Sequence, residues 1–312
     1  MVNDASRDVL EFEVTSEQTG QRIDRVVLHE LTGFGRRATA LLFAEGRVEL
    51  DGSLVKKGTM VSAGQIISVR LPPPDAAAPY PEAELSIVLL REELVIVDKP
   101  AGMPSAALRT STRSTLAGAL VARFPELGGI GFGPREPGLI HRLDTQTSGL
   151  VIAARSKAAF TALRSAMTRG ELTKKYLALI CPSDEVPEHG HIEAPLAPHP
   201  KNRRKVAVVT PSHPHAREAH TDFRVVERSG ELVLIELCVG RAYRHQIRAH
   251  LAWRGWPLLG DALYGGRAHP SLAPARHALH ASYIRCDAKA IERFEVSSPL
   301  PPDMREAFER PT

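Results

Sequence analysis

The chain has 312 residues, of which 43% are hydrophobic and 24% are charged. This composition supports a sizeable apolar core and excludes wholesale disorder. No run approaches the ~18 consecutive apolar residues that a membrane-spanning helix needs, and the polar amino terminus argues against a secretory signal peptide. The three cysteines are far apart and form neither a disulfide framework nor a C-x-x-C metal motif, so we expect a cytoplasmic protein without a membrane partner.

Positive charge is concentrated in one part of the sequence. Residues 201–254 contain 11 Lys and Arg against 5 Asp and Glu, whereas residues 1–75 contain 9 against 11. The net charge of the whole chain is +4. A local basic stretch indicates contacts with phosphate groups, although some soluble enzymes carry one without binding nucleic acid.

The first 71 residues show the pattern of a small, separately folded α/β unit. Apolar residues recur at helical spacing from Ile23 to Leu31, and a second such segment ends before Gly46, a typical helix stop. The pair Asp51-Gly52 between two short apolar segments is a strong hairpin signal. The predicted elements are helices over 23–31 and 36–45 and strands over 48–50 and 65–71. Residues 72–81 are rich in Pro and Ala and are predicted to form a semi-rigid linker.

The remaining residues, 82–312, form the predicted main domain. Ser156 and Gly170 mark the two ends of a helix with an apolar face, and Gly255 stops another helix that begins near Arg244. The predicted strands cover residues 85–90, 94–97, 150–154, 175–180 and 232–239. Because strands and helices do not alternate regularly, we expect the α+β class with a mixed, largely antiparallel sheet.

Two features of the main domain could suggest cofactors. The glycine-rich segment 128–133 lacks the spacing of a nucleotide-binding loop and is followed by Pro134 rather than by a helix start, so we interpret it as a plain loop. Five histidines lie among Pro, Gly and Glu residues, without helical spacing or a clear fourth ligand. They are His189, His191, His199, His213 and His215. The sequence therefore predicts neither a metal site nor a nucleotide cofactor.

The most informative segment runs from Gly138 to Leu150, where apolar residues flank a polar loop on both sides. Asp144 is expected on a tight connection between buried strands, where an unpaired carboxylate would be costly. Arg142, two positions away, and Arg248, distant in the sequence, are the candidate partners. The residues alone also allow that Asp144 only anchors its own turn through neighbouring threonines.

Five segments, in this order, resemble the signature motifs of the RluA-type family of RNA pseudouridine synthases. The catalytic aspartate of that family closes a His-Arg-Leu-Asp run, which is similar to residues 141–144. The amino-terminal unit resembles the small S-four RNA-binding domain, named for a ribosomal protein, that often precedes this catalytic domain. The matching segments are Asp98–Gly102, Gly138–Leu150, Lys174–Ala178, His245–Leu251 and Gly260–Gly265.

The resemblance implies an isomerase that converts uridine to pseudouridine in RNA. This reaction breaks a carbon–nitrogen glycosidic bond, turns the base and re-bonds it through carbon, without redox change or energy input, so no cofactor is expected. The resemblance assigns the catalytic carboxylate to Asp144 and the ring that stacks on uracil to Tyr176, and we expect Arg248 to keep Asp144 ionised. Large-subunit ribosomal RNA is the favoured substrate, with transfer RNA as the alternative, and no obligate protein partner is implied.

The enzyme must also bind RNA, and a target uridine inside an RNA helix must be flipped out of the helix. The resemblance implies that Arg142 fills the space that the base leaves, the alternative being an ion pair with Asp144. The basic run 201–205 and Arg244 are expected along the phosphate path, although that run could be only a solvated turn. Two extra residues in segment 240–244 leave open whether Arg241 or Arg244 takes the place of the family's arginine. The residues expected to bind RNA are His141, Arg142, Arg203, Arg204, Lys205, Arg244, Arg36 and Arg37.

Two other functions remain open from the sequence. The chain could be a catalytically silent RNA-binding protein, which the presence of Asp144, Tyr176 and Arg248 disfavours. It could also be a hydrolase in which Asp144 cleaves the glycosidic bond and leaves an abasic site. Mass spectrometry of the RNA separates the three functions, because isomerisation leaves the mass unchanged and hydrolysis removes a base.

Overall fold

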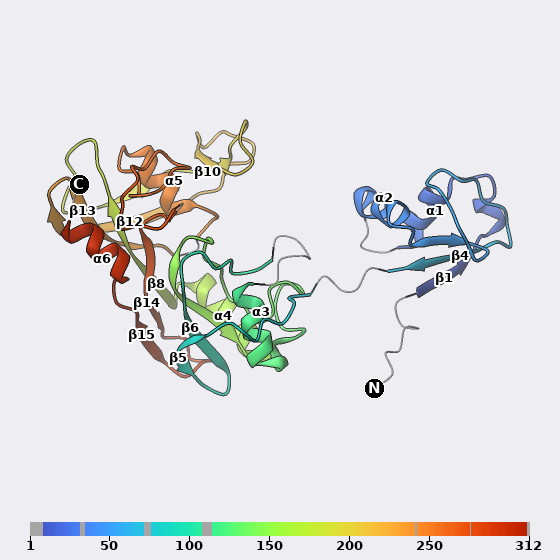
Figure 1. Cartoon of the computed structure of the whole chain (residues 1–312), viewed down its shortest axis with the longest axis horizontal. Helices are drawn as coiled ribbons and strands as arrows, with labels where there is room; N and C mark the ends of the chain where they lie inside the picture. The colour runs from blue at the N-terminus through green and yellow to red at the C-terminus, as the bar shows by residue number, and fades with distance from the viewer. Residues whose placement is uncertain are drawn as a thin grey trace. The chain divides into compact units, whose positions relative to one another are not determined.

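The computed structural model describes residues 9–31, 35–71, 76–107, 114–240, 242–274 and 276–310, apart from the side chains of Arg37, Ala38 and Leu41. The chain divides into two compact units, one up to Asp75 and one from Ala76 onward (Figure 1). Each unit has an apolar core of its own. None of the helices in the described ranges is long and apolar enough to cross a membrane.

The smaller unit packs two helices against a four-stranded antiparallel sheet of order β1-β4-β2-β3. Ile23, Val27 and Ile67 are fully buried in its core. Asp51 and Gly52 connect β2 to β3 with positive φ angles of 49° and 77°, which are the angles that this hairpin turn demands. The elements are β1 (Val9–Glu13), the short 3-10 helix η1 (Ser16–Gln18), α1 (Ile23–Glu30), α2 (Arg36–Ala44), β2 (Val48–Leu50), β3 (Ser53–Leu54) and β4 (Ile66–Arg70).

A nine-stranded sheet forms the centre of the larger unit. Its order is β5-β6-β7-β14-β8-β13-β12-β9, with β15 paired to β14. All neighbouring strands are antiparallel except β7 and β14, so the predicted α+β fold with a mixed, largely antiparallel sheet is confirmed. A separate hairpin consists of β10 (Leu196–Pro198) and β11 (Val206–Val208). The sheet strands are β5 (Ser86–Leu90), β6 (Leu94–Lys99), β7 (Ser148–Ala154), β8 (Leu172–Ile180), β9 (His189–Glu193), β12 (His220–Ser229), β13 (Leu232–Cys238), β14 (Leu279–Cys286) and β15 (Phe294–Ser297).

Helices cover both faces of this sheet. Side chains alternate between the two faces along a strand; on β6, Val95 packs in a cluster with α3 and α5, and Ile96 packs in a cluster with α4. Helix α6 packs against Leu179 of β8, on the face opposite Ala178, which packs with α5. Leu143, next to Asp144, lies in the cluster of α3 and α5. The helices are α3 (Leu116–Arg123), the short 3-10 helix η2 (Pro125–Leu127), α4 (Lys157–Arg169), α5 (Gln246–Trp253) and α6 (Pro302–Glu309).

The parallel contact between β7 and β14 depends on a glycine. Gly149 pairs with Ala281 at a φ of 114°, and a Cβ atom at this position would lie 2.3 Å from the carbonyl oxygen of Ala281. Only glycine permits such a close approach of two backbones at positive φ. Since Gly149 follows Asp144 by five residues, this contact fixes where the Asp144 loop enters the sheet.

Part of the predicted linker belongs to the larger unit. The Ala77 N–H donates to the carbonyl oxygen of Pro134 at 2.8 Å, and the Tyr80 N–H donates to that of Gly118 at 3.0 Å. Ala77 is also buried in the main core. Residues 72–75 lie outside the described ranges, so the structure places residues 76–81 on the larger unit and does not describe the rest of the linker.

Candidate active site

Asp144 lies on a short loop directly before β7, and the backbone of this loop is firmly held. The Ser105 hydroxyl donates to the Leu143 carbonyl oxygen at 2.7 Å and accepts from the Leu143 N–H at 3.0 Å. The Thr147 N–H donates to the Asp144 carbonyl oxygen at 3.0 Å, which closes a tight turn. The carboxylate of Asp144 itself is 25% exposed, so it is fixed in place and still accessible.

Lys99, the last residue of β6, connects the loop that follows this strand to the Asp144 loop. Its fully buried ammonium group donates to the carbonyl oxygens of Pro100 and Met103 at 2.8 Å and of Thr145 at 3.3 Å. Burial lowers the pKa of Lys99 to about 7, and the charge of Arg276 adds to this effect. Lys99 thus fixes backbone carbonyl groups, and it is not available as a surface cation.

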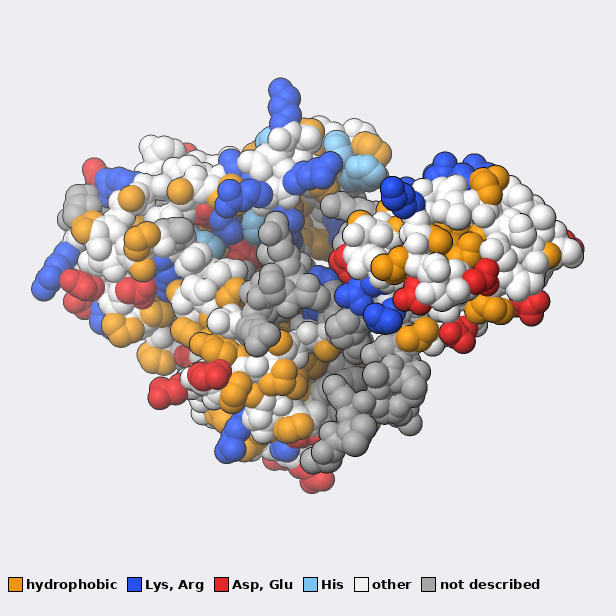
Figure 2. All heavy atoms as spheres, turned by 45° about the vertical axis from the view of Figure 1, so that its right-hand side comes forward, with side chains coloured by type: hydrophobic (Ala, Val, Ile, Leu, Met, Phe, Trp, Pro, Cys, Tyr) orange, Lys and Arg blue, Asp and Glu red, His pale blue; other side chains and the backbone are white. Residues whose placement is uncertain are grey.

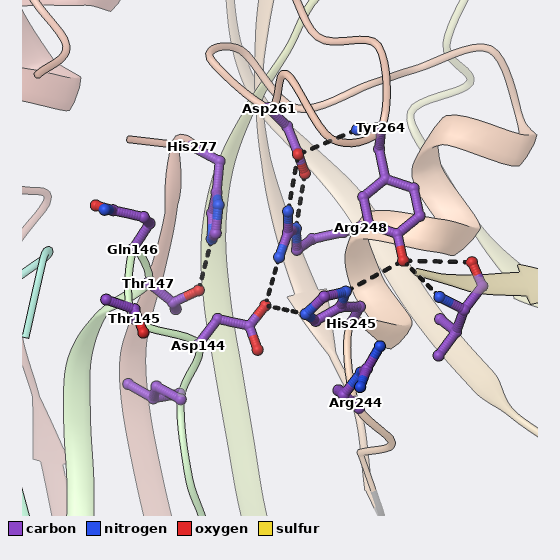
Figure 3. A network of polar contacts seen from close by, with 12 residues as sticks. Asp144, Thr145, Gln146, Thr147, Arg244, His245, Arg248, Asp261, Tyr264 and His277 are labelled. Carbon is purple, nitrogen blue, oxygen red and sulfur yellow. Dashed lines mark hydrogen bonds and ion pairs between the residues drawn. The ribbon is translucent and has the colours of Figure 1, made fainter. Parts of the chain in front are cut away.

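Arg248, in the first turn of α5, bridges two carboxylates (Figure 3). Its NH1 group donates to Asp144 Oδ2 at 2.8 Å, and its Nε and NH2 groups donate to the two oxygens of Asp261 at 2.7 and 2.8 Å. The side chains of Arg248 and Asp261 are only 8% and 2% exposed. The predicted contact between Asp144 and Arg248 is therefore confirmed, and Asp261 is an additional partner that the sequence did not reveal.

Arg248 and Asp261 each stabilise the charged form of the other. Burial opposes the charge of Arg248, but the hydrogen bonds and charges of Asp261 and Asp144 together outweigh burial and raise the pKa of the guanidinium. Burial likewise opposes the charge of Asp261, and the hydrogen bonds from Arg248 lower the pKa of that carboxyl overall. Both groups are charged at neutral pH, so Arg248 presents a permanent cation to Asp144.

Tyr176 lies on β8, in the same core cluster as Leu143, and is 5% exposed. Burial raises the pKa of its hydroxyl, and the negative charge of Asp144 raises this pKa further. The hydroxyl is therefore un-ionised at neutral pH. The structure thus brings together the three predicted catalytic residues: Asp144, Tyr176 and Arg248.

His245 and Tyr264 also belong to this site, and sequence reasoning missed them. His245 Nε2 lies 3.6 Å from Asp144 Oδ2, and His245 Nδ1 lies 3.2 Å from the Tyr264 hydroxyl (Figure 3). Burial lowers the pKa of His245, although the charge of Asp144 opposes this effect. Both residues fall within the matched segments 245–251 and 260–265, and that position was the signal that could have found them.

The basic run before β11 lies beside the same site. Arg244 donates to the Arg203 carbonyl oxygen at 2.8 Å, and the Lys205 ammonium group lies 5.4 Å from the centre of the Tyr264 ring. Arg203, Arg204 and Arg244 are exposed. Figure 2 shows Lys and Arg side chains gathered on one face of the larger unit, with histidines among them. Three of the predicted RNA-binding residues, Arg203, Lys205 and Arg244, are therefore close to neighbours of Asp144.

The other predicted RNA-binding residues are placed differently. Arg142 is 52% exposed and forms an ion pair with Glu136, so the alternative that it pairs with Asp144 is wrong. The ring of His141 is turned inward: the Ile152 N–H approaches its Nε2 at 3.4 Å, and its Nδ1 is buried without a hydrogen-bond partner in the described part of the chain. Burial holds the pKa of His141 well below its usual value. An uncharged, inward-facing ring does not suit the phosphate contact expected of His141.

Three arginines lie on the smaller unit or outside the described residues. Arg36, at the start of α2, is exposed on the smaller unit. The side chain of Arg37 and the whole of Arg241 lie outside the described residues.

The sequence predicts that the five histidines named above do not form a metal site. No group of three or more His, Cys, Asp or Glu side chains in the described ranges is arranged to hold a metal ion. His199 and His213 each use Nδ1 to accept backbone N–H groups within their own turns. The His191 ring stacks on His220 with 5.5 Å between ring centres. These histidines have local structural roles.

Comparison with known proteins places this site in a family. Residues 93–253 match the model of the RNA pseudouridylate synthase family. An uncharacterised RNA pseudouridine synthase of Chloroflexus aurantiacus is 34% identical over 294 residues, which are 94% of this chain and 90% of the relative. Ribosomal large subunit pseudouridine synthase D of Zymomonas mobilis is 32% identical over 307 residues, 95% of each chain.

A solved structure of a pseudouridylate synthase domain is also similar to this chain. Human RNA pseudouridylate synthase domain containing 1 superposes with a TM-score of 0.56 at 26% identity, covering 71% of this chain and 86% of the human one. The region that matches the family model, residues 93–253, contains Asp144, Tyr176 and Arg248. The chain thus belongs to the RluA-type family of RNA pseudouridine synthases and isomerises uridine to pseudouridine in RNA.

Proposed function

We propose that this enzyme modifies a specific uridine of large-subunit ribosomal RNA and that Asp144 is its catalytic carboxylate. The printed names of relatives from Zymomonas mobilis and Pseudomonas aeruginosa, 32% and 31% identical, support the ribosomal substrate. A ribosomal substrate would place the enzyme in the cytoplasm. The observation that carries the catalytic role is the buried bridge from Asp261 through Arg248 to the accessible carboxylate of Asp144.

The geometry suits the chemistry of the reaction. Arg248 and His245 both approach Oδ2 of Asp144, so Oδ1 would be the oxygen that meets the substrate. In isomerisation the bond from ribose C1′ to uracil N1 breaks, the base turns, and C1′ bonds to C5, which loses its proton while N1 gains one. Positive charge develops on the ribose as in glycoside cleavage, and a nearby carboxylate stabilises it or bonds to it.

Tyr176 would supply the flat surface against which the uracil ring is held. Its position beside Asp144 and its un-ionised hydroxyl support this role, because a neutral phenol does not repel the catalytic carboxylate. Stacking on an aromatic ring contributes about 1–3 kcal/mol per base. Arg142, half exposed and two residues from Asp144, would occupy the space from which the uridine is flipped.

The RNA backbone would run along the basic run before β11 and past Arg244. Arg203 and Arg204 are exposed, and Arg244 is anchored to the backbone of this run. The smaller unit, residues 1–71 of the chain, would act as an S-four-type RNA-binding domain through Arg36 and Arg37. We omit His141 from the contacts because its ring faces inward.

The test is a map of pseudouridine in total RNA. Cells with and without the gene are compared by carbodiimide labelling and primer extension. One or a few large-subunit ribosomal positions should lose their pseudouridine, and wild-type enzyme, but not Asp144→Asn, should restore them. Loss of signal only in transfer RNA would replace the ribosomal assignment by the alternative substrate.

A further inference from the structure

The Tyr264 hydroxyl joins the active site to the base of the β10–β11 hairpin. It accepts a hydrogen bond from the Val206 N–H at 2.9 Å, and its own hydrogen can be donated to the Val206 carbonyl oxygen at 3.3 Å. On its other side it lies 3.2 Å from His245 Nδ1. Strand β11 also contacts helix α5, which follows His245. One phenol group therefore connects the hairpin that carries the basic run to the residue beside Asp144 (Figure 3).

The hydrogen atoms of this chain of contacts favour one arrangement. If the Tyr264 hydroxyl donates to His245 Nδ1, the ring hydrogen of a neutral imidazole must reside on Nε2, which faces Asp144 Oδ2. The opposite tautomer would direct the Nε2 lone pair at a carboxylate oxygen. At 3.6 Å the Nε2 contact is longer than a hydrogen bond, so it orients the carboxylate by attraction without locking it.

The backbone of His245 has an unusual conformation that the surrounding structure must hold in place. Its φ is 56°, in the left-handed region that residues other than glycine seldom adopt. Its side chain is 14% exposed, and the charged groups around it come from three elements. These are Asp144 on its loop, Arg244 and Arg248 at α5, and Asp261 on the loop that carries Tyr264.

We infer that Tyr264 and His245 are positioning residues that couple the RNA-contacting hairpin to the orientation of the Asp144 carboxylate. Phosphate bound at the basic run would fix the hairpin, and the hairpin would fix Tyr264, His245 and thereby Asp144. The carboxylate would be fully oriented only when RNA is in place. This inference rests on the proposed catalytic role of Asp144.

The tautomer of His245 can be measured without any activity. In full-length enzyme with 15N-labelled histidine, the signals of His245 are those that disappear in His245→Asn, since asparagine tolerates positive φ. We expect Nε2 to be protonated and Nδ1 to be an acceptor. Tyr264→Phe should shift the Nδ1 signal and Asp144→Asn the Nε2 signal. A protonated Nδ1 in the neutral ring, or an Nδ1 signal that is the same in Tyr264→Phe and in wild type, would overturn the inference.

Kinetics test the coupling itself. With a ribosomal RNA fragment that carries the mapped uridine, Tyr264→Phe should weaken RNA binding and slow the saturated single-turnover rate, each about fivefold, because it removes one hydrogen bond on each side. His245→Asn should slow the rate to a similar degree and leave the RNA Kd unchanged. The double variant should be no slower than the slower single variant, because both act through one chain of contacts.

The same binding and rate measurements include a control variant and can contradict the inference. Tyr283→Phe removes a hydroxyl on β14 that bonds to Glu295, leaves the contacts of Tyr264 and His245 unchanged, and should change neither value. Rate losses that multiply in the double variant, or a wild-type rate in His245→Asn, would show that the two residues are not coupled to Asp144. If wild-type enzyme forms no pseudouridine in any ribosomal fragment, the proposed substrate fails, and the histidine signals still decide the inference.

Discussion

Replacing Arg248 with Met should destabilise the fold because it strands a buried carboxylate. Asp261 is 2% exposed and receives two hydrogen bonds from Arg248, at 2.7 and 2.8 Å. Methionine keeps much of the aliphatic volume and removes the charge. Breaking a buried pair on one side typically costs about 3–5 kcal/mol, a large share of the roughly 5–15 kcal/mol that stabilises most domains.

The assay is urea denaturation of the single and double variants. Arg248→Met and Asp261→Asn should show a coupling energy of several kcal/mol, since the double variant no longer contains an unpaired buried charge. Arg248→Met and Asp144→Asn should be coupled more weakly, because Asp144 is 25% exposed and water can replace its partner. Additive losses for Arg248 and Asp261, or equal coupling to both carboxylates, would refute this account of the bridge.

The loss should also depend on pH. Arg248 lowers the pKa of Asp261 in the folded enzyme, so the stabilisation from Asp261 is present above the unfolded value of about 3.9 and is lost as the pH falls through the folded pKa. Arg248→Met removes the main group that opposes the effect of burial, so the pKa of Asp261 rises, and protonation of this carboxyl in acid removes the unpaired charge from the variant. The difference in unfolding free energy between wild type and variant should therefore be largest at neutral pH and should narrow below about pH 4.

Three further outcomes can be checked in the same way. Gly149→Ala should cost more than about 3 kcal/mol in urea denaturation, because its Cβ would lie 2.3 Å from the Ala281 carbonyl oxygen, whereas Gly170→Ala, at φ 76° in open space, should cost about 1 kcal/mol. Arg244→Ala should weaken RNA binding in a filter assay and reduce its salt slope by about 1, with little change in stability. Deleting residues 1–75 should leave a folded enzyme that is active on a short stem-loop but binds full-length ribosomal RNA more weakly and with a flatter salt dependence.

Local signals predicted much of the fold. The Ser156 hydroxyl accepts from the Ala159 N–H at the start of α4, and Gly170 ends that helix at positive φ, as the sequence indicated. By contrast, β12 and α6 were missed. Strand β12 carries mostly exposed polar residues, because it lies near the edge of the sheet, and it lacks the apolar run that identifies a buried strand. The parallel pairing of β7 with β14 joins segments more than 130 residues apart, and no local pattern encodes it.

The candidate site was predicted in part. The expectation that Asp144 would be buried and need a cation led to Arg248, 104 residues away, although its carboxylate is in fact 25% exposed. The second carboxylate, Asp261, lay in a matched segment, but only the three-dimensional structure shows that Arg248 has N–H groups left over to bind it. No local pattern indicated that the His141 ring would turn inward while the next side chain, Arg142, is half exposed.

The central claim is that the Asp144 carboxylate performs the isomerisation, and purified Asp144→Asn tests it most directly. The variant is incubated with a ribosomal RNA fragment that wild-type enzyme modifies, and pseudouridine is measured by carbodiimide labelling alongside the intact RNA mass. Asparagine has nearly the same shape but is a poor nucleophile. We expect no pseudouridine, an unchanged RNA mass and nearly unchanged RNA affinity and unfolding free energy. A wild-type rate of pseudouridine formation by folded Asp144→Asn would contradict the assignment of catalysis to Asp144.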